Sequence, residues 1–88
     1  MEMSKKEMGL AVRAIAQYAS DCSGNADYLE MDKAFKIALN IANMYELREE
    51  EFIVNTYDVY LSEAMEELEY EIAQGEKARD ILDELERR

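Results

Sequence analysis

The 88-residue chain contains no histidine and no proline, and it has only one cysteine and three glycines. Without histidine there is no Glu-x-x-His set for a di-iron bundle and no imidazole base to activate a thiol. Cys22 lies among apolar helix positions, so we expect it to be buried and inert. Three scattered glycines form no Gly-rich phosphate loop. We therefore expect no catalytic residue and no cofactor, and we predict that the protein is not an enzyme.

Basic residues and long apolar runs are also scarce. Ten Lys and Arg stand against 21 Asp and Glu, which gives a net charge of -11. Nucleic acids and anionic membranes repel such a chain, so we expect neither to bind directly and a basic protein surface to be the partner. No run approaches the roughly 20 apolar residues of a membrane span, and no signal peptide is visible. With a lone cysteine, these features favour a cytoplasmic protein.

The sequence is nevertheless rich in apolar residues at helical spacing. About half of its residues are hydrophobic (49%), which argues against disorder despite the charge, and its length suits one domain over residues 1–88. Apolar positions recur at steps of three and four. The predicted helices cover about 4–22, 27–46, 48–74 and 76–87. We predict an all-α fold: a small helical bundle of three main helices plus a short C-terminal helix.

Capping signals indicate where the first two helices begin. Ser4 and Glu7 have the spacing of a capping box, in which each residue satisfies a backbone N–H of the other. Asp27 and Glu30 repeat that spacing, so a second box is expected there.

The sequence leaves two helix boundaries undecided. A break near Leu47 depends on the acids Glu49–Glu51, which favour the first turn of a new helix because that end of the dipole is positive. Gly75 offers either an end or a kink, so the third and fourth helices are either separate or continuous.

In each helix, the apolar residues that recur at steps of three and four form an apolar stripe along one side. This stripe predicts which residues are buried. In the third helix we expect the stripe to include Val54, Tyr57 and Leu61. Tyr18 and Tyr45 also fall on apolar stripes, and we expect them in the core or at its edge.

The acidic residues are concentrated in one segment. Residues 46–71 hold ten of the 21 acids and a single base, Arg48, for a net charge of -9. Phe52, Val59 and Tyr70 fall well away from the apolar stripe, beside Glu63 and Glu66. An outer face that mixes acids with large apolar groups suits contact with a cationic partner that also offers apolar surface.

This pattern leads to our functional hypothesis: a non-enzymatic module that docks the acidic third helix on a basic surface of a partner protein and blocks or regulates it. The predicted contact residues are Glu49, Glu50, Glu51, Phe52, Asp58, Val59, Glu63, Glu66, Glu67, Glu69 and Tyr70. Carboxylates three or four residues apart along a helix are spaced by about 5–6 Å, comparable with nucleic-acid phosphates. The sharpest form of the hypothesis is therefore a nucleic-acid mimic of the phage anti-restriction or anti-CRISPR kind.

Two alternatives remain. One is a homodimeric structural or regulatory subunit, since a chain of this size has a small core that a second copy would enlarge. Its interface would comprise Phe52, Val59, Tyr70 and the stripe of the fourth helix, and dimerisation through the first or fourth helix is equally compatible. The other is a degenerate EF-hand-like calcium loop, whose weak candidate ligands are Asp21, Ser23, Asn25, Asp27 and Asp32. Their spacing fits calcium, but Ala26 stands where the loop needs glycine and Asp32 where it needs glutamate.

Overall fold

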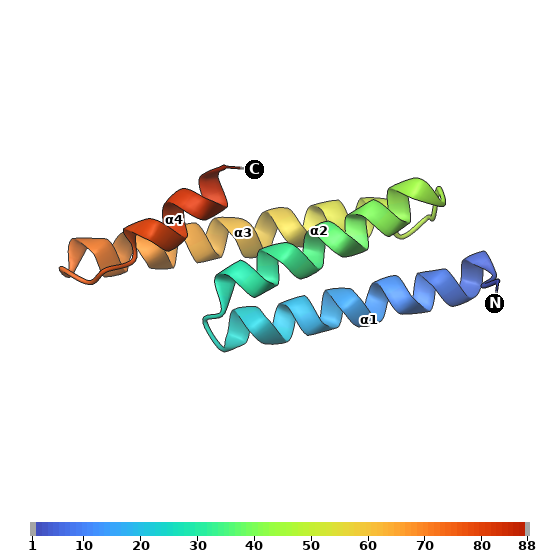
Figure 1. Ribbon diagram of the computed structural model, residues 1–88, viewed down its shortest axis with the longest axis horizontal. Helices are drawn as coiled ribbons and strands as arrows, with labels where there is room; N and C mark the ends of the chain where they lie inside the picture. Colours follow the sequence, from blue (N-terminus) through green and yellow to red (C-terminus); the bar gives the residue numbers. More distant parts are fainter. Residues whose placement is uncertain (1, 88) are drawn as a thin grey trace.

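The computed structural model describes residues 2–87, and in it the chain folds into helices joined by short turns (Figure 1). The helices are α1 (Lys5–Gly24), α2 (Tyr28–Met44), α3 (Glu50–Ala73) and α4 (Arg79–Glu86). No strand occurs in this described part of the chain. The predicted all-α fold of three main helices and a short C-terminal helix is confirmed. The predicted helix ends differ from the observed ones by at most three residues.

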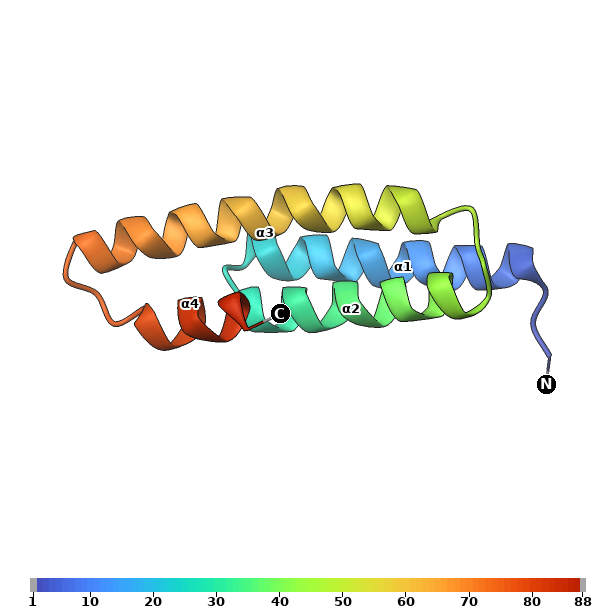
Figure 2. The ribbon, with the colours of Figure 1, turned by 90° about the horizontal axis from the view of Figure 1, so that it is seen from above.

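Helices α1 and α2 form an antiparallel hairpin (Figure 2). Helix α3 packs against this hairpin, mainly on α2. The far end of α3 runs past the hairpin, and α4 turns back beside it to reach the beginning of α2. The molecule measures 49 × 20 × 19 Å. Its radius of gyration is 14.4 Å, against about 12 Å for a compact domain of this length. This elongated shape leaves one side of every helix at the surface.

The first predicted capping box is confirmed and the second is wrong. Ser4 N donates to Glu7 Oε1 at 3.0 Å, and Glu7 N donates to Ser4 Oγ at 3.2 Å. Asp27 does occupy the N-cap of α2, but its side chain makes no capping hydrogen bond. Glu30 instead accepts a hydrogen bond from the Tyr18 hydroxyl at 3.2 Å, so a contact between helices has replaced the local one.

The three long helices end in the same way. One residue after each C-cap has a positive φ: 60° at Ala26, 52° at Glu46 and 88° at Gly75. The next backbone N–H then reaches back five residues, from Asp27 to Cys22 at 2.9 Å, Leu47 to Ala42 at 2.8 Å and Glu76 to Glu71 at 3.0 Å. These bonds define Schellman motifs, which satisfy the last carbonyls of a helix. The breaks near Leu47 and at Gly75 are therefore true helix ends.

The core is built around Phe35 of α2, which is fully buried. Its ring stacks on Tyr57 with a centroid distance of 5.3 Å and lies 5.6 Å from the ring of Tyr60. Cys22 is buried and free, as predicted. None of the described helices combines the length and apolar composition needed to span a bilayer.

Three residues that the stripes predict as buried are exposed. Val54 is 36% exposed, Tyr18 51% and Tyr45 44%. In α3 the buried stripe starts at Ile53. The rotation of α3 against α2 turns the line of Ile53, Tyr57 and Leu61 toward the core and leaves Val54 at its edge. Tyr45 follows the last residue of α2. Tyr18 belongs to the outer side of α1, away from α3.

Candidate functional site

The acidic residues of α3 lie opposite the side that packs into the bundle. Its buried positions are Ile53, Tyr57, Leu61, Ala64 and Leu68. Successive residues of a helix are separated by 100°, so the positions between these point outward. The exposed fractions of Phe52, Val59 and Tyr70 are 57%, 55% and 63%.

Five of the predicted contact residues form one continuous line. Phe52, Val59, Glu63, Glu66 and Tyr70 follow one another at steps of seven, four, three and four, so they share a stripe of the helix surface. All five are exposed. We call this stripe the acidic ridge. Its two glutamates lie between Val59 and Tyr70, which gives the ridge an acidic centre between apolar ends.

The remaining predicted acids occupy other positions. Glu51, Asp58 and Glu69 are exposed on the opposite flank of α3, at steps of seven and eleven. Glu67 is exposed on the flank of the ridge that faces the end of α1. Glu50 is half-buried. The prediction treated these acids as one set, whereas the structure divides them between two flanks.

Glu49 does not present its carboxylate to solvent. Its side chain is only 10% exposed, and its Oε2 lies 3.3 Å from Arg13 Nη2 of α1 and 3.9 Å from Arg48 Nε. The carboxylate sits over Gly9, where an added Cβ would come within 2.6 Å of Glu49 Oε2. Glu49 therefore ties the start of α3 to α1.

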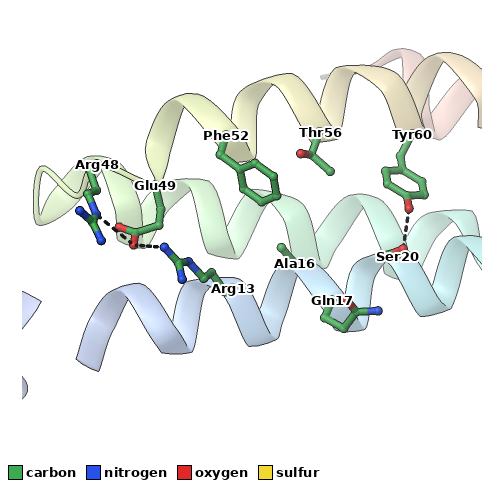
Figure 3. Close-up of a pocket in the computed structure, with 9 residues that line it drawn as sticks. All are labelled: Arg13, Ala16, Gln17, Ser20, Arg48, Glu49, Phe52, Thr56 and Tyr60. Atoms are coloured by element: carbon green, nitrogen blue, oxygen red, sulfur yellow. Dashed lines mark hydrogen bonds and ion pairs between the residues drawn. The ribbon is translucent and has the colours of Figure 1, made fainter. Parts of the chain in front are cut away.

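A groove borders the ridge between α1 and α3 (Figure 3). Its volume is about 630 Å³, and Ala16, Thr56 and Phe52 lie along its length. The ion pair of Arg13 and Glu49 stands at one end, and a 2.6 Å hydrogen bond between the hydroxyls of Ser20 and Tyr60 spans the other. This groove was not predicted from the sequence. The small residue Ala16 opposite α3 was the available signal, but it identifies no neighbour by itself.

Neighbouring groups raise the pKa values of two tyrosines. Burial, and then the carboxylates of Glu67 and Glu71, raise the pKa of Tyr28 above its usual value. Contact with Cys22, followed by the charge of Glu30, raises the pKa of Tyr18 to about 12. Within residues 2–87, the ion pairs involve none of Glu63, Glu66, Glu67 and Glu69.

The candidate calcium ligands do not come together. Asp21 and Ser23 belong to the last turn of α1, and Asp27 is the N-cap of α2. Asp32 is buried in α2, where it accepts hydrogen bonds from the Tyr57 hydroxyl and from Lys36 Nζ at 2.8 Å. Asn25 is the C-cap of α1, so helix ends occupy the place of an EF-hand loop. Among the described residues, no three His, Cys, Asp or Glu side chains gather as a metal site would require.

Comparison with known proteins finds no matching family model, no similar curated protein and no similar solved structure.

Proposed function

We propose that the protein is a binding module that docks the acidic ridge of α3 on a basic surface of a partner protein and thereby blocks or regulates that partner. The observation that carries the proposal is the combination of unpaired, exposed carboxylates at Glu63 and Glu66 with exposed apolar side chains on the same stripe. Charge complementarity with a basic partner would steer the encounter and set the register, and the apolar residues would supply buried area.

The arrangement of charge in α3 carries a cost that solubility does not require. Like charges at i,i+4 destabilise an isolated helix by about 0.2–0.5 kcal/mol per pair. Glu63 and Glu67 form one such pair, and no lysine in the ridge offsets it. A solvated surface would mix the two signs of charge. A cationic partner would relieve the repulsion, which favours docking over simple solvation.

A nucleic-acid-binding protein is the partner that fits best. The 24 residues of α3 form a rod about 36 Å long, close to one turn of duplex DNA. A straight rod with repeated negative groups would suit the groove in which such a protein holds its phosphates. The specific form of the proposal is therefore a nucleic-acid mimic of the phage anti-restriction or anti-CRISPR kind.

Competition with nucleic acid tests this proposal. The protein is immobilised and presented with a panel of purified nucleases and other nucleic-acid-binding proteins at low salt. A bound member of the panel should be released by duplex DNA or RNA. It should also be released at about 0.5 M salt, because exposed charge contacts are screened over a few ångströms there. Failure of every member to bind, or release by neither agent, would overturn the proposal.

Matched variants separate the ridge from net charge. Glu63→Lys with Glu66→Lys should abolish binding, whereas Glu76→Lys with Glu86→Lys changes the net charge equally at exposed positions outside α3 and should retain it. Equal losses from both pairs would mean that the overall charge binds the partner and that the ridge is not the site.

A further inference from the structure

The side of the α1–α2 hairpin away from α3 carries a second exposed stripe, and it is apolar. Met8, Ile15 and Tyr18 come from α1, and Ile37, Ile41 and Met44 come from α2. The steps of three, four and seven place each trio on one stripe of its helix. Met8 and Ile41 line a common depression of about 620 Å³ between the helices. We call these six residues the outer hairpin face.

This face is open to solvent despite its composition. The exposed fractions of Tyr18, Ile37 and Met44 are 51%, 46% and 72%, and the other three residues are partly buried. Helix α3 packs on the other side of the hairpin, where Asp32 and Phe35 meet it. Within residues 2–87, the N-terminal segment borders this face, because Glu2 and Met3 line the same depression as Met8 and Ile41.

The face is also poor in charge, although 35% of all residues are charged. The six residues of the face carry no charge themselves. Lys33 is exposed one turn before Ile37 on the α2 stripe, and Glu2 borders the depression at the other end. Glu30 stands at one end of the α2 stripe, where it accepts the hydrogen bond of Tyr18. The charged groups therefore border the face, and water would be displaced mainly from uncharged side chains.

We propose that the outer hairpin face binds a second copy of this chain. Two hairpins then pack face to face as a layer of four helices, related by a two-fold axis, with the two α3 helices on opposite outer sides. This inference does not depend on the function proposed for α3, because it uses neither the acidic ridge nor its partner.

The distribution of charge favours association of two copies through the outer hairpin face over association through the acidic side of α3. Each chain carries a charge of -11, so most encounters between copies are repulsive. In the face-to-face arrangement the two α3 helices are separated by two hairpins, or about 25–30 Å at usual helix spacings. The Debye length is about 8 Å at physiological salt, so repulsion between their carboxylates is largely screened.

The available area suits a dimer of moderate affinity. Two neighbouring helices of 20 and 17 residues are about 25–30 Å long and present roughly 600 Å². That gives about 1,200 Å² in total, at the lower end of specific interfaces. The flexible side chains of Met8 and Met44 can adapt to a facing copy. We therefore expect a dimer that forms at micromolar concentration.

Sedimentation equilibrium of the full chain tests the proposal over about 1–200 μM, a range that covers weak and moderately stable dimers. The wild type should sediment as a dimer at the upper end. Raising the salt to about 1 M should preserve or strengthen the dimer, because it screens the remaining repulsion and leaves apolar contacts intact. A monomer throughout this range would overturn the proposal, as would a dimer that salt dissociates.

Two variants locate the interface. Ile37→Lys with Met44→Lys should weaken dimerisation at least about 100-fold, since burying unpaired ammonium groups is costly. Val59→Lys makes the same kind of change at a similarly exposed position of α3 and should leave the dimer intact. Circular dichroism checks that each variant remains helical. If Val59→Lys dissociates the dimer and the α2 pair does not, copies associate through α3 and the proposal fails.

Discussion

The hydroxyl of Tyr57 in α3 donates a hydrogen bond to Oδ1 of Asp32 in α2, inside the core. Asp32 is 7% exposed, and its other oxygen accepts from Lys36 Nζ at 2.8 Å. A buried carboxylate is tolerated when donors surround it, and here α2 and α3 each supply one. The contact therefore fixes the rotation of α3 on α2, which in turn decides which residues of α3 face outward.

We predict that Tyr57→Phe destabilises the protein by about 1–3 kcal/mol, because it leaves one oxygen of a buried carboxylate without its donor. Tyr57→Phe combined with Asp32→Leu should cost less than the sum of the single changes, since the double variant leaves no unsatisfied carboxylate. Urea denaturation followed by circular dichroism measures these differences. Additive single and double effects would show that the two side chains are not coupled.

A second prediction concerns Gly9 and Glu49. Alanine is about 1 kcal/mol better than glycine inside a helix. In the wild type, Gly9→Ala should show none of this gain, because the new Cβ displaces Glu49 from its ion pair with Arg13. In a Glu49→Ala background the same change should stabilise by about 1 kcal/mol. Thermal unfolding of the four proteins measures the coupling, and an equal gain in both backgrounds would contradict the close approach.

A third prediction concerns the ends of α1 and α2. Ala26 and Glu46 have φ values of 60° and 52°, which glycine adopts more readily than other residues. Ala26→Gly and Glu46→Gly should each stabilise by about 0.5–1 kcal/mol, after the greater freedom of glycine in the unfolded chain is subtracted.

The matched control for Ala26 lies two residues earlier. Gly24 is within α1, and a Cβ there would meet nothing within 4 Å. Gly24→Ala should therefore stabilise the protein, whereas Gly75→Ala, at a φ of 88°, should destabilise it. Chemical denaturation measures whether each substitution raises or lowers the free energy of unfolding. A gain from alanine at both glycines would contradict the Schellman geometry at Gly75.

The capping box at the start of α1 predicts a pH dependence. Hydrogen bonds from the backbone N–H of Ser4 and then from its hydroxyl lower the pKa of Glu7 below its ordinary value of 4.5. The unfolded chain thus binds the proton more tightly, so this stabilisation is present above the unfolded pKa and is lost as pH falls through the folded pKa. The stability difference between wild type and Glu7→Gln should shrink over about pH 6 to 3. A constant difference would contradict the prediction.

The local parts of the fold were predictable from the sequence. Steps of three and four located the helices to within three residues, and Ser4 with Glu7 located the first cap. These features depend on contacts within one or two turns. The exposure of Phe52, Val59 and Tyr70 was also predicted correctly, because these residues lie far from the apolar stripe of α3.

The features that the sequence did not reveal concern residues whose environment is made by another helix. In the sequence, Glu49 is one of three consecutive acids. In the structure it forms an ion pair with Arg13, which lies 36 residues earlier in the chain. From the sequence, Asp32 was only a weak candidate ligand of a degenerate calcium loop, and its place in the core depends on Tyr57 of α3. Val54 and Ile53 are neighbours of similar chemistry, and only the seating of α3 on α2 selects which one is buried.

The sequence by itself determined the helices and the concentration of negative charge in α3, since periodicity and composition are properties of neighbouring residues. The tertiary structure alone decided how that charge is divided between two flanks and which carboxylates are tied internally. It also decided that the outer hairpin face is open to solvent. The physical reason is that the rotation of one helix against another depends on packing and on buried hydrogen bonds between distant residues, which a local pattern does not encode.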